Sequence, residues 1–435
     1  MIKNIFILSI IAEPFLFFTL NDISTTIARI LQFLIISILI IKYFFISRVV
    51  IKFNNVSEFK PYFYFIIYFL LSILIVTPIY LLNLTQNYPL LKEQFLINQF
   101  YIDYFKKFIY ELSIYFYYVL YFICLPIVIL KKQNDFKFLE YLILILVVLF
   151  LIIGFVDYKF QFLCRHLHEL INGSCFTVGR RFHSFAGEPR QAAIAIIFLL
   201  FLVNYLKIDK FKFISLFLFI ALLLTKSFIA YVAIFFSVLI FCLYIIIYNI
   251  NFKYLLLIAS ILFFILLISF EPQKISNNYD SRIIDYFFSI LNTDLNKDFA
   301  KLSYNVRVQI GEIYPFINFT NQIFNFKFLN FIFGNGFFSS AIDTFINFYP
   351  SIDSPGNPNS QFIRLTYDFG FIGIYFFIYP FFLFIKRVVK KFSALEIFFY
   401  IMLLVICLLQ RSSLIFIATG LSISIEYLKS FNNRE

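Results

Sequence analysis

The chain has 435 residues, of which 62% are hydrophobic and only 14% are charged, and its formal net charge is +12 at pH 7. A soluble protein of this length would carry about a quarter of its residues as charged side chains, so the composition excludes an ordinary soluble globular protein. Apolar runs of about 17 or more residues recur along the chain, each long enough to cross a hydrocarbon core of about 30 Å. The composition therefore predicts an all-α, polytopic membrane protein.

Hydropathy predicts about twelve transmembrane helices, with eleven to about thirteen left open, in a single integral membrane domain over residues 1–435. No small-residue cleavage site follows the first apolar run, so we interpret it as a membrane helix and not as a removed signal peptide. The predicted spans lie at 5–20, 27–46, 62–82, 112–130, 138–156, 190–206, 211–225, 227–248, 253–270, 361–385, 394–410 and 412–428.

Clusters of basic residues in three short loops predict the orientation of these spans. Because short cytoplasmic loops are enriched in lysine and arginine, the three loops are expected inside and both termini with them. The basic excess is thus a topology signal, and a nucleic-acid partner is not expected. The clusters are Lys131, Lys132 and Lys137; Lys207, Lys210 and Lys212; and Lys386, Arg387, Lys390 and Lys391.

Two long polar segments, 157–189 and 271–360, are then predicted to face outward together with the loop 83–111. Cys164 and Cys175 share the first segment, where an oxidising compartment would allow a disulfide. The sequence does not show whether their Cα atoms come close enough, so both the bridged and the free forms stay open.

Charged residues are scarce within the predicted spans. Glu13 is one exception, and with Pro14 it either kinks the first helix or lies near its outer end. Lys226 and Arg411 fall at predicted outward turns, where their long side chains can reach the membrane surface. An ion-coupled transporter more often carries acidic groups in mid-span, so this scarcity argues against transport.

The first outward segment contains all three histidines of the chain, so a catalytic imidazole has to come from here. His166 and His168 suggest a metal pair, but no third ligand follows at a recognised spacing. We therefore interpret this stretch as a solvated loop and predict no metal site and no cofactor.

A helix start is predicted at Pro189, because proline is favoured in the first helical turn, where its missing N–H is not needed. The free backbone N–H groups of that turn, flanked by Arg180, Arg181 and Arg190, form a suitable site for a phosphate or diphosphate. The alternative is a set of arginines that reach for lipid headgroups. That alternative does not account for the clustered Glu188 and His183, so we favour a binding site.

The second outward segment, 271–360, is predicted to contain amphipathic helices lying on the membrane. Arg307 is predicted to lie in a later helical stretch of the same segment that ends near Pro315. Gly334-Asn-Gly336 predicts a tight turn, and a proline-rich loop that ends at Asn359 leads into the tenth span. A lone Gly-x-Gly is far from a dinucleotide-binding fingerprint.

Taken in order, these features resemble the superfamily of O-antigen polymerases and O-antigen ligases of bacterial cell envelopes. The resemblance covers about residues 178–385, and the flanking helices match only in number and topology. It lies in Arg181-x6-Glu188-Pro189, Arg307, Gly334-x-Gly336, Asn359-Ser360 and Asp368-x-Gly370-x-x-Gly373.

The resemblance implies a membrane-embedded glycosyltransferase with a GT-C-like fold in the bacterial inner membrane, and an undecaprenyl-diphosphate-linked oligosaccharide as donor. The expected partners are this donor, the lipid bilayer and a chain-length regulator protein. Negative charge develops on the leaving diphosphate, so arginines are the expected catalytic groups, and no divalent metal is required. The predicted catalytic residues are Arg181, Arg307, Glu188 and His183, and the predicted substrate-binding residues are Arg180, Arg190, Asn359, Arg364 and Gly336.

One departure separates the chain from the ligases that it resembles. These carry His-Asn before the late helix, whereas the matching place here is Pro358-Asn359-Ser360. This favours a polymerase, with transfer to lipid A core or another acceptor as the alternative. The general base is left open among Glu188, His183 and Asp353. A flippase of lipid-linked oligosaccharides is a third hypothesis, but such proteins are expected to show two pseudo-symmetric halves, and no half-to-half repeat is evident.

Overall fold

The computed structural model describes residues 2–15, 27–41, 56–87, 97–130, 133–160, 181–186, 189–208, 213–248, 327–348, 360–388, 392–410 and 412–432. All regular secondary structure in these ranges is helical, which confirms the predicted all-α class. Two short elements, η2 and η3, are a π-helix and a 3-10 helix. The elements are α1 (Ile2–Ile11), α2 (Ile27–Ile41), α3 (Val56–Asn87), α5 (Ile97–Tyr117), η2 (Tyr118–Cys124), α6 (Leu125–Ile129), α7 (Gln133–Phe160), η3 (Ser184–Ala186), α9 (Pro189–Tyr205), α10 (Phe213–Leu224), α11 (Phe228–Tyr248), α16 (Phe328–Phe333), α17 (Ser339–Phe348), α18 (Gln361–Val388), α19 (Ala394–Leu409) and α20 (Leu414–Asn432).

By length and composition, four helical segments in the described part of the chain are able to cross a membrane. They are Lys60–Tyr80, Phe105–Ile129, Asp135–Phe160 and Gln361–Arg387. Shorter apolar helices overlap the other predicted spans, except that the predicted span 253–270 lies outside the described residues. The predicted span 5–20 is not one helix over its described part, because α1 ends at Ile11 and the chain turns at residues 12–14 beside Pro14. The helices are thus compatible with a multi-pass membrane protein.

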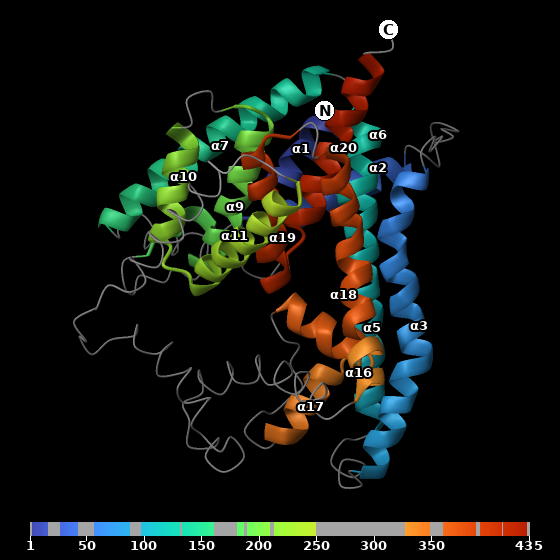
Figure 1. Ribbon diagram of the computed structural model, residues 1–435. Coiled ribbons are helices and arrows are strands. Elements are labelled where there is room, and N and C mark those ends of the chain that lie inside the picture. Colours follow the sequence, from blue (N-terminus) through green and yellow to red (C-terminus); the bar gives the residue numbers. More distant parts are fainter. Residues whose placement is uncertain are drawn as a thin grey trace, which may run out of the picture.

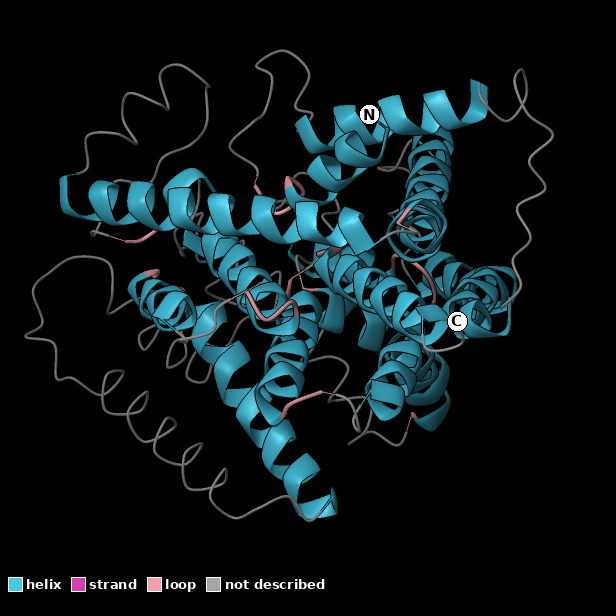
Figure 2. Ribbon diagram, turned by 90° about the horizontal axis from the view of Figure 1, so that it is seen from above, coloured by secondary structure: helices cyan, strands magenta, loops and turns pink. Residues whose placement is uncertain are grey.

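Three long helices, α3, α5 and α18, form a column along one side of the molecule (Figure 1). α1 begins and α20 ends at one end of this column, whereas α16 and α17 lie at the other end (Figure 1). The remaining helices gather beside the column and cross one another at varied angles, as the view from above shows (Figure 2). Ion pairs between Lys3 and Asp135 and between Arg387 and Glu426 connect helix ends.

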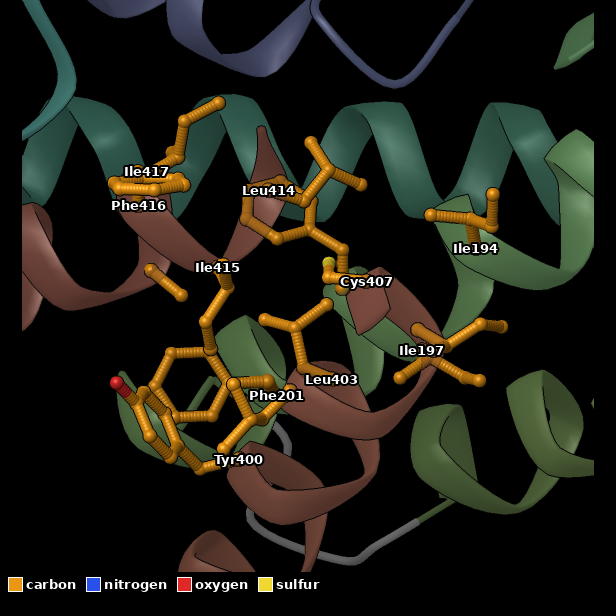
Figure 3. Close-up of a cluster of buried hydrophobic side chains, with 14 of the residues drawn as sticks. Ile194, Ile197, Phe201, Tyr400, Leu403, Cys407, Leu414, Ile415, Phe416 and Ile417 are labelled. Carbon is orange, nitrogen blue, oxygen red and sulfur yellow. The ribbon is translucent and has the colours of Figure 1, made fainter. Parts of the chain in front are cut away.

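The centre of the core is α9, whose side chains are buried without a break from Ala192 to Asn204. A helix that is apolar on every side is typical of a protein core or of a membrane span. Here α7, α10, α11, α19 and α20 surround it. Phe201 lies 5.5 Å from Tyr400 of α19, ring centroid to centroid, within the cluster drawn in Figure 3.

A close contact between backbones joins α20 to the π-helix η2. A Cβ added at Gly420 would lie 1.8 Å from the carbonyl oxygen of Phe122, so only glycine fits here. Small residues permit such close approaches between apolar helices, where dispersion contacts replace the hydrophobic driving force. The C-terminal helix is therefore held directly against the segment that follows α5.

The predicted span 361–385 is one stretch of helix by hydropathy, but the structure divides it. Gly370 has φ 64° and ψ −166°, so a short N-terminal segment of α18 meets the long remainder at an angle. A residue with a Cβ is strongly disfavoured in this backbone conformation. The break separates the N-terminal segment of α18 from the column. It also leaves backbone carbonyl groups that accept hydrogen bonds from a neighbouring segment.

Candidate functional site

Two glycine motifs that are far apart in the sequence form one joint. The backbone N–H groups of Asn335 and Gly336 donate to the carbonyl oxygens of Tyr367 and Asp368, each at 3.0 Å. A Cβ at Gly334 would lie 2.3 Å from the Asp368 carbonyl oxygen, so the two backbones touch. The chain bends at Asn335 between the two glycines, and the contact partner of this bend is the break in α18.

The carboxylate of Asp368 caps the start of α17. It accepts hydrogen bonds from Ser340 N at 2.8 Å, from Phe338 N at 3.2 Å and from the Ser339 hydroxyl at 3.0 Å. A carboxylate at a helix N-terminus satisfies orphan N–H groups and interacts favourably with the helix dipole. Asp368 is fully buried, so its role in this structure is to fix α17 to the break in α18.

A small, partly open pocket lies between α3, α5, the N-terminal segment of α18 and the α19–α20 turn. Its walls are mostly aromatic, and its polar groups come from three different elements. The aromatic walls include Phe65, Phe69, Tyr115 and Phe416, and the polar lining includes Gln361 and Ser412. Pockets for small ligands combine apolar walls with a few placed polar groups in this way.

A buried ion pair forms the charged part of the pocket wall. Arg364 Nη1 lies 2.9 Å from Glu111 Oε2, with the two side chains 4% and 6% exposed. Arg364 Nε lies 3.8 Å from Asp368 Oδ2, which is a longer contact than the one with Glu111. Among the described residues, neither Nε nor Nη1 of Arg364 makes a hydrogen bond, so the contact with Glu111 is close but poorly directed.

A second buried network borders the same pocket at the α19–α20 turn. The Glu13 carboxylate accepts hydrogen bonds from Arg29 at 2.6 Å, from Gln32 at 2.7 Å and from Ser413 at 2.9 Å. Ser413 adjoins Ser412, which lines the pocket. Glu13 lies in a turn just after α1, so it pins the α1–α2 hairpin to one wall of the pocket.

The predicted Arg181 segment rests on α7. His183 Nε2 lies 3.2 Å from Asp157 Oδ2, and His183 Nδ1 lies 2.9 Å from the carbonyl oxygen of Arg181. Both His183 and Asp157 are buried. Phe182 N donates to Leu224 O at 2.9 Å, and the Phe182 ring fills the space beside Gly154. His183 therefore connects α7 to the backbone of Arg181.

Aromatic contacts bring the Arg181 segment close to the Glu13 network. The rings of Phe185 and Phe15 lie 4.7 Å apart, centroid to centroid, and Phe15 is two residues beyond Glu13. Arg190 lies in the first turn of α9, which begins at Pro189 as predicted. Its buried Nε makes no hydrogen bond within the described ranges. The Arg181 segment and the Arg364 pocket thus border the Glu13 turn from two sides.

The predicted site residues are distributed as follows. Arg181, His183 and Arg190 share the segment before and at the start of α9, whereas Arg364 and Gly336 lie on the side of the column. Arg180, Glu188, Arg307 and Asn359 lie outside the described residues, as do Asp353, Cys164 and Cys175.

Two acidic residues of the site were missed by sequence reasoning. Glu111 was placed in the loop before the predicted span 112–130, but α5 extends well beyond this limit and buries it. Hydropathy places Asp157 first in an outward loop, whereas it belongs to the last turn of α7. The available signal was in both cases a single carboxylate next to a long apolar run.

Within the described ranges, no group of three or more His, Cys, Asp or Glu side chains is arranged to hold a metal ion. No protein-family model matches the chain, and neither a curated protein nor a solved structure matches it.

Proposed function

We propose that this chain is a membrane-embedded glycosyltransferase that polymerises a bacterial surface polysaccharide. It transfers a growing glycan from undecaprenyl diphosphate to a lipid-linked repeat unit on the outer face of the inner membrane. The observation that carries this proposal is the position of Arg364. It is a buried cation in the wall of an aromatic pocket, and its Nε and Nη1 make no hydrogen bond with any described residue.

The chemistry of the donor matches such a pocket. A polyprenyl diphosphate combines an apolar chain with a compact dianionic group, and it needs aromatic or aliphatic walls next to a cation. Arginine suits the anionic group because its planar guanidinium donates several hydrogen bonds to phosphate oxygens. In a site that excludes water, preorganised donors of this kind stabilise the negative charge that develops on a leaving diphosphate.

The Arg181 segment supplies a second set of cationic groups. Arg181 precedes α9, and Arg190 lies in the first turn of that helix. The free N–H groups of a helix N-terminus favour an anion. We propose that Arg181 and Arg190 bind the diphosphate of one lipid-linked substrate while Arg364 binds that of the other, since the reaction uses two such lipids.

The proposed topology is a GT-C-like arrangement of about twelve spans with both termini in the cytoplasm. In support, α1 begins and α20 ends at the same end of the molecule (Figure 1). The α19–α20 turn beside the pocket is then on the outward side, where lipid-linked repeat units are polymerised.

Deletion of the gene in its native host tests the proposal, with gel analysis of the lipid-linked and surface glycans. A polymerase deletion leaves single repeat units, on the carrier or on the final acceptor. Full-length lipid-linked polymer that remains unattached would instead identify a ligase. Repeat units held on the cytoplasmic face would contradict both reactions and identify a flippase.

Complementation of the deletion with variants tests the site. Arg364→Gln and Arg181→Ala are expected to abolish polymer at normal protein levels. Arg387→Gln is a matched control, because this arginine is also ion-paired on α18 but lies at the opposite end of the helix. Normal polymer length with both site variants would remove these arginines from the mechanism.

A further inference from the structure

Glu111 is the only carboxylate among the residues that line the described pocket, and Arg364 is the only cation. Glu111 projects from α5 and is 7% exposed. An ionised carboxylate inside a membrane protein is costly unless a partner or a function compensates for its desolvation. Glu111 has such a partner in Arg364, at 2.9 Å.

The geometry of this pair is unusual for a purely structural ion pair. Buried pairs stabilise a fold only where their hydrogen bonds are well directed and the remaining donors are satisfied. Here the buried Nε and Nη1 of Arg364 make no hydrogen bond with any described residue. Asp368, the other nearby carboxylate, is committed to the start of α17. Arg364 therefore has N–H groups at the pocket wall that can donate hydrogen bonds to a ligand.

We propose that Glu111 is the group that takes the proton from the attacking hydroxyl in the transfer reaction. This inference rests on the proposed function. The hydroxyl of the acceptor sugar gives its proton to the Glu111 carboxylate, and its oxygen forms a bond to the anomeric carbon of the donor. The bond from that carbon to the phosphate oxygen breaks, and its electron pair leaves with the lipid diphosphate.

The ion pair couples these two events. As Glu111 becomes neutral, it ceases to compensate the charge of Arg364, and the guanidinium becomes available to the departing diphosphate. Positive charge thus becomes free at the moment when negative charge develops on the leaving group, which is the condition for transition-state stabilisation. After the transfer, protonated Glu111 returns its proton to water and re-forms the pair.

His183 is less suited to this role in the structure. Its two ring nitrogens face the Asp157 carboxylate and the Arg181 carbonyl oxygen, and both of these groups accept hydrogen bonds. A base needs to lie within hydrogen-bond reach of the substrate hydroxyl. Glu111 lines the described pocket, whereas His183 is not among the residues that line it.

Chemical rescue tests the proposal. The purified protein is assayed in detergent with the lipid-linked repeat unit that accumulates in the deletion strain. Loss of a general base lowers kcat by on the order of 100-fold or more, so Glu111→Ala is expected to show this loss. Formate at high concentration fits the space left by the carboxylate and is expected to restore activity by about tenfold or more. Glu111→Asp is expected to retain intermediate activity.

A second variant keeps the test independent of folding. Glu111→Gln preserves the volume of the side chain but leaves the charge of Arg364 uncompensated, so binding of farnesyl diphosphate, measured as a rise in Tm, is expected to be at least as strong as in the wild type. Its kcat is expected to fall as far as that of Glu111→Ala and not to respond to formate, because the amide fills the space.

The outcomes separate the two proposals. Wild-type protein that fails to elongate the repeat unit would overturn the proposed function itself. An active wild type, together with Glu111→Gln that retains a tenth or more of kcat, would overturn the role of Glu111 alone. Loss of activity in Glu111→Ala without rescue by formate would also overturn it, since a structural role of the carboxylate predicts that result.

Discussion

The carboxylate of Asp368 accepts a hydrogen bond from the backbone N–H of Ser340 at 2.8 Å, across a gap of 28 residues in the sequence. This contact fixes the first turn of α17 to the end of the N-terminal segment of α18. Tyr367 and Asp368 also accept hydrogen bonds from the N–H groups of Asn335 and Gly336, so several hydrogen bonds hold the two segments together. The position of Arg364, one helical turn before Asp368, depends on it.

Asp368→Asn is expected to loosen α17 without removing side-chain volume. Hydrogen bonds to a charged acceptor contribute about 1.5–3 kcal/mol each, and an amide keeps only part of that. We expect a clear fall in Tm in detergent and earlier proteolysis near α17. Asp135→Asn serves as the control, since this aspartate belongs to a more exposed ion pair and its loss should cost about 1 kcal/mol or less. An equal effect of both variants would contradict the capping role.

Gly370→Ala is expected to disrupt the joint between the two glycine motifs. The added Cβ would lie 2.4 Å from Gly334 N and 2.5 Å from Ile332 O, and both of these are backbone atoms. At φ 64° and ψ −166° the backbone lies in a region that only glycine occupies readily, which adds strain of about 1–3 kcal/mol to this overlap. We expect little monodisperse protein after purification. A variant that purifies and melts like the wild type would show that the break at Gly370 is not required.

Single removal of either partner of the Glu13–Arg29 pair is expected to destabilise the protein more than removal of both. Breaking a buried pair leaves one uncompensated charge and costs about 3–5 kcal/mol, whereas apolar replacement of both partners is often neutral. Arg29 is 35% exposed and Glu13 only 7%, so Glu13→Leu, which leaves the better solvated charge unpaired, should lie at the low end of that range. Thermal unfolding of Glu13→Leu, Arg29→Met and the double variant gives the coupling energy. Additive effects of the two changes would argue against a coupled Glu13–Arg29 pair.

Asp157 and His183 are expected to act as positioning residues for Arg181. Asp157→Asn weakens the hold on the imidazole, and His183→Gln removes its contact with the Arg181 carbonyl oxygen. Each change is expected to lower kcat by about tenfold, by analogy with the loss of groups that orient a catalytic or metal-binding residue. Because both act through the same contact, the double variant should be no worse than either single one. Multiplicative losses would assign them separate roles.

The pH dependence of stability is expected to carry a contribution from Asp343. Burial raises the pKa of this carboxyl above its ordinary value of 3.8, although hydrogen bonds from Tyr367 and Tyr80 oppose the change. The folded protein therefore binds this proton more tightly than the unfolded chain does. The resulting stabilisation is complete below pH 3.8 and is lost as the pH rises through the raised pKa.

Asp343→Asn should remove this dependence. The Tm difference between the wild type and the variant is expected to move in favour of the wild type as the pH is lowered from 7 toward 4. The hydrogen bond from Tyr80 Oη to Asp343 Oδ1, at 2.5 Å, provides a control, because Tyr80→Phe should keep the direction of the pH effect. A difference that is constant with pH would contradict the raised pKa.

The sequence by itself determined the helical class and the places of most described helices. Apolar runs such as the one after Pro189 are read correctly because a helix in an apolar setting must bond its own backbone, whatever surrounds it. The start of α9 at Pro189 follows from local chemistry alone, since proline suits the first helical turn.

Only the tertiary structure decided which of these pieces meet. Glu111 and Arg364 are more than two hundred residues apart in the chain, and hydropathy placed Glu111 just outside a span. Gly334 and Gly370 were read as separate motifs, although each leaves space for the backbone of the other. Hydropathy and helix signals depend on residues within a few turns of each other, whereas a buried ion pair or a close contact between backbones depends on packing across the whole fold.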